Sequence, residues 1–434
     1  MLSISFGNST KITIINFLIN LIPLSLIIGN SATNLNIFLI CLMGIYIYKK
    51  EIFYINQQIY KYLIYSFFLY LILITLLNNW PYFSVNELYK LHFFKSIFFL
   101  RMLLFFLVIN KLIEKNDFNI KNFFLSCSLF SIIIAVDILY QFTFKENLIG
   151  YEITHSKPSS FFNEENIAGG FLQKFLLIFL FYIVSLKKNK NYLNLFILII
   201  SIILLVPIIL TGNKMPMIIY LSSIIFYFLI EKKVKYFFMS MLIIVTILFC
   251  ITKINTSERY NVGIKNFFNE TKDLIFKSPN LFINNPDNFV YSWRTGYLIH
   301  YNTGVQIWKT NKIFGNGLKS FRLKCTYEKN QTCNTHPHNY FIELMVDTGM
   351  IGIILIYSIY ILGLINFYKY YIKEKNINTR LVKVVFFILI FFELFPLRST
   401  GSFFTTNNSV FIFLILAIFL NFKKINNLHD IRKN

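Results

Sequence analysis

The sequence predicts an all-α, polytopic membrane protein with about 12 transmembrane helices and one large, mainly helical external domain between helices 9 and 10. Of its 434 residues, 56% are hydrophobic and only 14% are charged, and its mean hydropathy is +0.58. A soluble domain carries about 25% charged residues. Long apolar runs recur along the chain, and the positive charges gather between them. These three observations indicate that lipid, rather than water, is the main solvent of the chain.

Twelve apolar runs supply the predicted helices. A helix needs about 20 predominantly apolar residues to cross a bilayer, because it satisfies its own backbone hydrogen bonds where no water is present. The fourth run contains His92, Lys95 and Arg101, which are unusual in such a segment. The runs lie near residues 11–28, 33–48, 62–77, 91–110, 122–141, 166–185, 192–210, 215–231, 235–252, 339–367, 381–397 and 408–422.

The positive charges fall in alternate loops between these runs. Lys and Arg are enriched in the cytoplasmic loops of membrane proteins, so the loops that contain them are expected to share the cytoplasmic side. Both termini are then cytoplasmic, and no cleavable signal peptide is expected. The net charge of +22 follows from this pattern and does not indicate a nucleic-acid partner. The lysine-rich loops lie near residues 49–50, 111–121, 187–190, 232–235 and 369–383.

The chain divides into three parts by composition. Residues 1–252 hold helices 1 to 9, residues 253–338 form the large polar segment, and residues 339–434 hold helices 10 to 12 and a cytoplasmic tail. The polar segment is rich in Asn and turn residues. Long external segments are translocated with little regard to their charge. We therefore expect a small helical domain on the outer surface of the membrane.

Four short motifs occur in order at the end of the polar segment and the start of the next helix. They are Ser-Trp-Arg-Thr-Gly at 292–296, Ile-Phe-Gly-Asn-Gly at 313–317, His-Pro-His-Asn-Tyr at 336–340, and Asp-Thr-Gly-Met-Ile-Gly at 347–352. This ordered set resembles the O-antigen ligase and O-antigen polymerase family of bacterial envelope glycosyltransferases. The resemblance is best over residues 290–355.

The resemblance implies a reaction at the periplasmic face of the bacterial inner membrane. In this family a glycan is transferred from undecaprenyl pyrophosphate to a sugar hydroxyl by a metal-independent, inverting glycosyltransferase without a cofactor. A ligase uses the lipid A core as acceptor, whereas a polymerase uses a second lipid-linked glycan. The motifs are common to both, so the sequence does not separate the two activities.

Two residues match the essential positions of the family. His338 is expected to act as general base, since a His side chain titrates near neutral pH. Arg294 is expected to hold the leaving pyrophosphate through its planar pair of donors. Alternatively, His338 caps a helix and Arg294 pairs with a surface acid. Glu343 could orient His338 or only stabilise the start of the following helix.

Three further cations are candidates for binding the anionic donor. Lys214 stands where the family commonly has an Arg, and supplies charge without the planar fork. Arg398 lies at the outer end of the eleventh run, and Arg101 lies inside the fourth. Lys214 and Arg398 could instead reach the lipid headgroups. A charge within a spanning helix is costly, so Arg101 could instead pair with an interior acid, Glu87 or Asp137.

The neighbours of His338 complete the predicted site. His336 and Asn339 flank it and are expected to border the substrate. A His-x-His sequence can bind a metal, but outside the membrane only His155 and His300 remain as further His ligands, and no acidic cluster has ligand spacing. No metal site is therefore predicted.

Two cysteines precede the His-Pro-His triplet in the external segment. Cys325 and Cys333 are separated by seven residues. In an oxidising compartment they can close a short loop. We expect a disulfide that steadies the segment presenting His338.

Two other functional classes remain open. A transporter or flippase of lipid-linked glycans would also need many helices and cations facing an anionic substrate. Its key polar groups should lie near the middle of the membrane in two related halves, whereas this chain concentrates its His, Arg and Cys residues in one external segment. A scaffold without catalytic activity would leave the His and Arg motifs unexplained.

Overall fold

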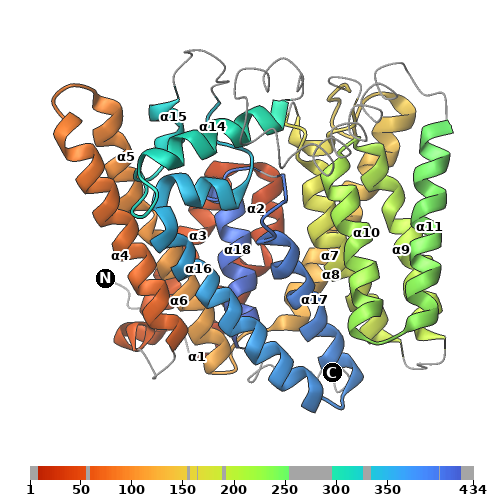
Figure 1. Ribbon diagram of the computed structural model, residues 1–434. Coiled ribbons are helices and arrows are strands. Elements are labelled where there is room, and N and C mark those ends of the chain that lie inside the picture. Colours follow the sequence, from red (N-terminus) through yellow and green to blue (C-terminus); the bar gives the residue numbers. More distant parts are fainter. Residues whose placement is uncertain are drawn as a thin grey trace.

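The computed structural model describes residues 8–54, 59–153, 157–163, 165–187, 192–253, 296–325, 334–399 and 401–421. Over these residues the fold is all helical, which confirms the predicted class, and contains no strand beyond an isolated bridge between Glu146 and Glu152. The helices run between two ends of the bundle (Figure 1). We call the end that carries α14 (Gly296–Thr310) and α15 (Ser320–Lys324) the upper end, as drawn in Figure 1.

Every predicted apolar run coincides with a helix or with two consecutive helices. Seven helices of the described residues are long and apolar enough to cross a membrane, or eight if the bent pair α1 and α2 is one span. The predicted number of twelve and the division into three domains stay predictions. The helices are α1 (Asn8–Asn20), α2 (Ile22–Ile28), α3 (Asn30–Tyr48), α4 (Ile59–Asn79), α5 (Glu87–Phe98), α6 (Leu100–Glu114), α7 (Ile120–Phe144), α8 (Ala168–Leu186), α9 (Leu193–Leu210), α10 (Lys214–Ile230), α11 (Val234–Lys253), α16 (Tyr340–Lys373), α17 (Ile377–Glu393) and α18 (Thr406–Leu420).

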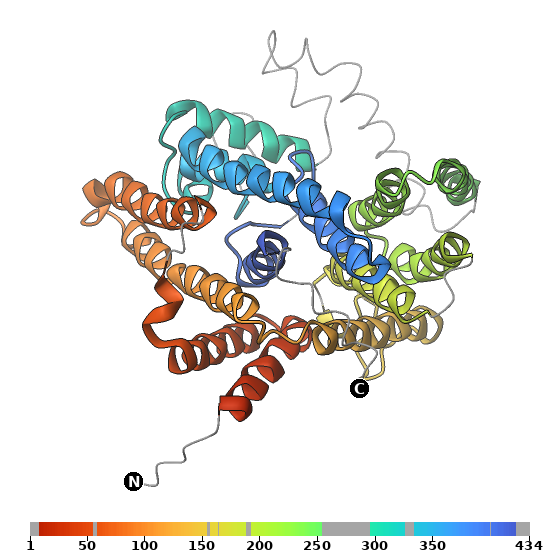
Figure 2. The ribbon, with the colours of Figure 1, turned by 90° about the horizontal axis from the view of Figure 1, so that it is seen from below.

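The last helix, α18, is the centre of the bundle. All its residues from Ser409 to Leu420 are buried. It contacts α3, α6, α16 and α17, and Figure 2 shows it enclosed by the other helices. The peripheral helices instead expose large apolar side chains, such as Leu69, Ile203 and Phe238. Such surfaces are stable against lipid tails, so the chain is a multi-pass membrane protein.

Helix α16 is broken near its upper end at Gly349, where φ is +61°. The break releases backbone groups on both sides, and the turn that follows α14 pairs with them. Met350 N donates to Lys312 O at 3.0 Å, and Gly317 N donates to Asp347 O at 2.8 Å. A Cβ atom on Gly349 would lie only 2.3 Å from Ile313 O. Two of the sequence motifs therefore form one backbone-to-backbone joint that attaches α14 to α16.

The turn after α14 is also attached to α4. Thr75 Oγ1 accepts a hydrogen bond from Leu318 N at 2.9 Å, and Tyr70 OH donates to Phe314 O at 2.5 Å. The buried carboxylate of Asp347 accepts bonds from Lys319 N at 2.7 Å and Ser320 N at 3.0 Å. These contacts fix the start of α15 between α4 and α16.

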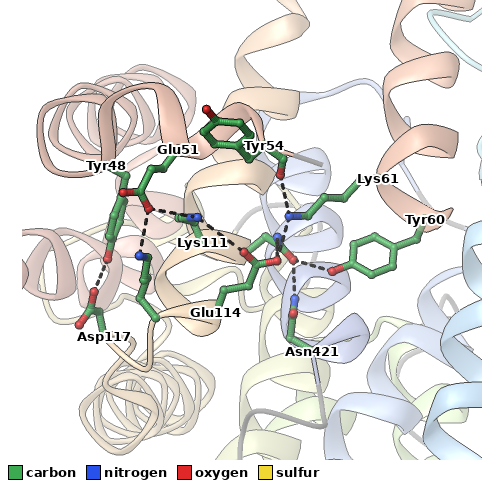
Figure 3. Close-up of polar contacts among 11 residues, drawn as sticks. Tyr48, Glu51, Tyr54, Tyr60, Lys61, Lys111, Glu114, Asp117 and Asn421 are labelled. Atoms are coloured by element: carbon green, nitrogen blue, oxygen red, sulfur yellow. Dashed lines mark hydrogen bonds and ion pairs between the residues drawn. The ribbon is translucent and has the colours of Figure 1, made fainter. Parts of the chain in front are cut away.

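The lower end of the bundle contains a polar network (Figure 3). Lys61 pairs with Glu114 at 2.8 Å, and both side chains are at most 3% exposed. Asn110 bonds Glu114 at 3.1 Å and accepts from Asn421, the residue after α18. A buried ion pair is strongly destabilising to break, because one charge is left without a partner. The network therefore fixes the lower end of α18.

The described parts of the lysine-rich loops lie at this same lower end, as the alternation of charge predicts (Figure 1). Lys115 and Lys111 bond Glu51 at 3.0 and 3.4 Å. On the other side of the bundle, Arg380 bonds Glu231, which joins the loop after α16 to the loop after α10.

Candidate active site

His338 lies at the upper end, two residues before the first turn of α16. Its φ of +56° is uncommon for a residue other than glycine. The next residue, Asn339, explains how the backbone is held there. Its Oδ1 caps α16 by accepting from Ile342 N at 2.9 Å, and its Nδ2 donates to Pro396 O at 2.7 Å and Arg398 O at 3.0 Å. Asn339 therefore fixes His338 to the loop between α17 and α18.

Three imidazoles gather at this position. The ring centroid of His338 lies 4.2 Å from that of His336 and 5.4 Å from that of His300 in α14. Asn334 Nδ2 lies 2.8 Å from His338 Nε2, within hydrogen-bond distance. The rings of His336 and His338 are partly exposed. The sequence predicted that His300 lies outside the membrane but did not predict its contact with His338, which depends on the position of α14.

The two imidazoles of the triplet differ in environment. Nε2 of His336 is buried and has no hydrogen-bond partner within the described part of the chain. Burial, together with positive charge on His338, His300 and Lys319, lowers the pKa of His336 to about 4. His336 is therefore neutral at physiological pH and unsuited to donate a proton there.

This lowered pKa predicts a pH-dependent stability. As the pH falls through 6.5, the unfolded chain binds a proton at His336, whereas the folded chain binds it only near 4. The folded state is thus expected to lose stability between these values. His336→Gln, which does not titrate, should lose less. Thermal unfolding of both proteins in detergent at several pH values measures this difference, and identical declines would contradict it.

Arg398, a candidate for binding the anionic donor or for reaching the lipid headgroups, is buried in the structure. It is 6% exposed and pairs through Nη1 with Glu393 at the end of α17. Glu393 also binds Lys174 of α8 at 3.0 Å. The three side chains form a buried cluster with one net positive charge. Nε of Arg398 has no hydrogen-bond partner in the described residues.

Glu343 does not orient His338. Its carboxylate accepts bonds from Ser402 Oγ and Phe403 N, both at 2.6 Å. Glu343 lies on the first turn of α16, and its 3% exposed side chain faces the loop before α18. Together with Asn339, it attaches the start of α16 to two points of that loop.

Lys214 is the first residue of α10 and is partly exposed. The preceding turn packs tightly on α8, because a Cβ atom on Gly169 would lie 2.6 Å from Thr211 Oγ1. Gly212 in this turn has a φ of +65°. The turn therefore reverses the chain from α9 into α10, which begins at the upper end (Figure 1) and packs against α8.

Arg101 does not form the interior ion pair that was one expectation. Its side chain is exposed, and Nη2 donates to Thr406 Oγ1 at 3.1 Å. Asp137 instead accepts bonds from Leu148 N at 2.9 Å and Ser160 Oγ at 2.5 Å. Arg101 thus contacts the N-terminus of α18, beside the loop that carries Arg398.

Two predicted residues lie outside the described part of the chain. Arg294 precedes α14 by two residues, and its position relative to His338 stays a prediction. Cys325 is disulfide-bonded, and Cys333, its predicted partner, is also outside the described residues. Among the described residues, no three His, Cys, Asp or Glu side chains are grouped to hold a metal ion.

The sequence analysis missed one cation inside α8, Lys174, and a pair of cations at the upper end, Lys319 and Arg322. Lys174 was read as part of an apolar run, although a lysine in the middle of a spanning helix requires a counter-charge. Lys319 and Arg322 in the segment of α15 were not singled out. The unusual His92 and Lys95 in the fourth run were the signal for that pair.

The upper end of the helical bundle thus carries three histidines with cations nearby. By fold and site, the chain belongs to the class of multi-pass membrane proteins with a polar site at one end of the bundle. Residues 199–357 match the family model described as O-antigen ligase. This match confirms the predicted resemblance to the O-antigen ligase and polymerase family, and indicates a glycosyl-transferring enzyme. The matched range includes Lys214 and His338 and ends before Arg398. No curated protein sequence matches the chain.

Proposed function

We propose that this protein transfers a glycan from undecaprenyl pyrophosphate to a sugar hydroxyl. The site lies at the periplasmic face of the bacterial inner membrane, with both termini in the cytoplasm. The acceptor is the lipid A core for a ligase or a second lipid-linked glycan for a polymerase. The observation that carries the proposal is the group of imidazoles at the upper end, attached through Asn339 to the loop of Arg398.

His338 acts as the general base in this proposal. The Asn334 amide lies 2.8 Å from Nε2, and in this proposal Nε2 carries the lone pair that accepts the proton. The acceptor hydroxyl replaces this amide and gives its proton to Nε2 as its oxygen attacks the anomeric carbon. The bond between that carbon and the pyrophosphate oxygen breaks, and undecaprenyl pyrophosphate leaves. A single displacement of this kind inverts the anomeric configuration without a metal.

Cations stabilise the leaving pyrophosphate as its negative charge grows. We assign Arg294 as the main clamp, because its guanidinium can donate two parallel bonds. Lys214 adds a positive charge at the N-terminus of α10, where the helix dipole also favours an anion. Arg398 contributes through the net positive charge that it shares with Lys174 and Glu393. Arg101, His336 and Asn339 border the substrate.

The test is transfer by the purified full-length protein in lipid nanodiscs. The donor is a radiolabelled undecaprenyl pyrophosphate glycan, and lipid A core and unlabelled lipid-linked glycan are offered in separate reactions. Label in the first acceptor indicates a ligase, and label in the second indicates a polymerase. Arg294→Ala should lower the rate roughly 10²-fold, and Arg294→Lys should lower it less.

Two outcomes would contradict the proposal. One is the absence of transfer to either acceptor by folded protein that binds the donor. The other is full transfer by Arg294→Ala, which would show that Arg294 does not hold the pyrophosphate. Movement of the labelled donor across the bilayer of sealed vesicles without transfer would favour a flippase.

A further inference from the structure

A second group of cations lies at the upper end, on α5 and α15. Lys95 is on α5, and Lys319 and Arg322 are at α15 (Figure 1). Lys319 and Arg322 lie within electrostatic range of Lys95. Arg322 is exposed, and the other two side chains are partly exposed. None of the three forms an ion pair with an acidic side chain of the described residues, although the buried carboxyl groups of Asp347 and Glu343 lie within electrostatic range of Lys319. Three like charges are therefore held near one another with no acid in direct contact among the described residues.

Hydrogen bonds of the backbone keep the two segments that carry these cations close to each other. The segment before Lys319 is bonded to α4 through Thr75 and Leu318 at 2.9 Å. Asp347 accepts from the Lys319 backbone amide at 2.7 Å. Helix α5 is bonded to α4 through Asn79 Nδ2 and Tyr89 O at 3.1 Å. Both carriers of the cations are therefore anchored on α4, and the charges cannot separate without breaking buried contacts.

A buried imidazole lies among the three cations. His92 is 1% exposed, and its Nδ1 is buried with no hydrogen-bond partner among the residues that the structure describes. Lys95, Lys319 and Arg322 all lie within electrostatic range of its ring. Leaving a buried polar atom unpaired is costly. Like-charge repulsion and an unpaired imidazole nitrogen are both relieved when an anion binds.

We propose that Lys95, Lys319, Arg322 and His92 form a second anion site that takes a phosphate group of a glycolipid or phospholipid. A phosphate carries up to two negative charges and three acceptor oxygens, which suit two ammonium groups and one planar guanidinium. The acid on α5, Glu87, lies eight residues from Lys95, about 12 Å along the helix, and does not neutralise it.

The site lies next to the proposed active site. Lys319 is within electrostatic range of His336 as well as of His92. A substrate phosphate held there would place the sugar attached to it near His338. This role in positioning a phosphorylated substrate rests on the proposed glycan transfer, whereas phosphate binding itself does not.

The experiment measures binding, without transfer. A fluorescent diphosphorylated glycolipid and its dephosphorylated counterpart are titrated into the full-length protein in phosphatidylcholine nanodiscs. The wild-type protein should bind the phosphorylated probe about tenfold more tightly or better, equivalent to about 1.4 kcal/mol. Lys319→Gln/Arg322→Gln should reduce this ratio to about one. Lys309→Gln/Lys312→Gln removes the same charge from exposed residues around the end of α14 and should leave the ratio unchanged.

A second arm identifies the source of the phosphate. Nanodiscs with one fifth phosphatidylglycerol are compared with pure phosphatidylcholine. If the headgroup is the ligand, phosphatidylglycerol raises the thermal midpoint of the wild type but not of Lys319→Gln/Arg322→Gln, and abolishes the preference for the phosphorylated probe. If a glycolipid is the ligand, the preference persists.

The proposal is overturned if the wild type shows no phosphate preference and no response to phosphatidylglycerol. It is also overturned if the double variant keeps the wild-type response in both arms. Because transfer is assayed separately, a protein that binds phosphate but transfers no glycan would refute only the proposed function.

Discussion

His338→Ala is expected to lower the rate of glycan transfer by about 10²- to 10⁴-fold, which is the usual contribution of a general base. The acceptor hydroxyl would then have to lose its proton to water. The backbone at this residue, with its φ of +56°, is held by the hydrogen bonds of Asn339 to Ile342 and to the loop before α18, which the substitution leaves in place. The variant should therefore fold, bind donor and show a reduced kcat with a KM that changes little.

The neighbouring imidazole provides the comparison for this variant. Burial and nearby positive charge keep His336 neutral, so His336→Gln should lower transfer by far less than His338→Ala. The two variants are compared by their initial rates of transfer at saturating donor, after their thermal midpoints are shown to match. Equal losses in the two variants, or full activity of His338→Ala, would rule out His338 as the base.

Gly349→Ala is expected to lower the free energy of unfolding by roughly 2 to 5 kcal/mol. The φ of +61° disfavours any side chain. The added Cβ atom would also meet Ile313 O at 2.3 Å and Gly315 N at 2.5 Å. Both neighbours are backbone atoms, so relief requires that the turn after α14 move off the break in α16.

A glycine elsewhere supplies the control for this variant. Gly170 lies in α8, and a Cβ atom there would meet nothing within 4 Å, so Gly170→Ala should leave stability unchanged or slightly raised. Thermal and denaturant unfolding in detergent compare the two variants. A stable Gly349→Ala protein with wild-type transfer would show that the joint between α14 and α16 is dispensable.

The sequence predicted where the helices lie more accurately than how they bend or pair. Apolar runs mark the helices because each must face lipid or neighbouring helices along its length, and every run coincides with a helix or helix pair. The sequence showed the motif that contains Gly349 but did not predict the break in α16. The break is stabilised by hydrogen bonds to a turn more than thirty residues earlier in the chain. That pairing depends on tertiary contact.

In the candidate site, too, the sequence predicted the residues but not their tertiary contacts. The His-Pro-His triplet and its place at the end of the bundle were predicted from residue type and order. The buried cluster of Arg398, Glu393 and Lys174 was not, because α8 and α17 come together only by tertiary packing. The spacing left open whether Glu343 orients His338 or only stabilises the start of α16. The direction of its side chain depends on the rotation of α16, which spacing after a loop does not define.

Asn339 and Glu343 hold the loop before α18 at two places, Pro396 to Arg398 and Ser402 to Phe403. His338 and Arg398 therefore belong to one stiff unit, and their separation is set before any substrate arrives. This half of the site is preorganised, so no conformational free energy should be spent on bringing His338 and Arg398 together in each turnover. Conformational adjustment during a reaction cycle is then expected to come from elements that do not touch this unit.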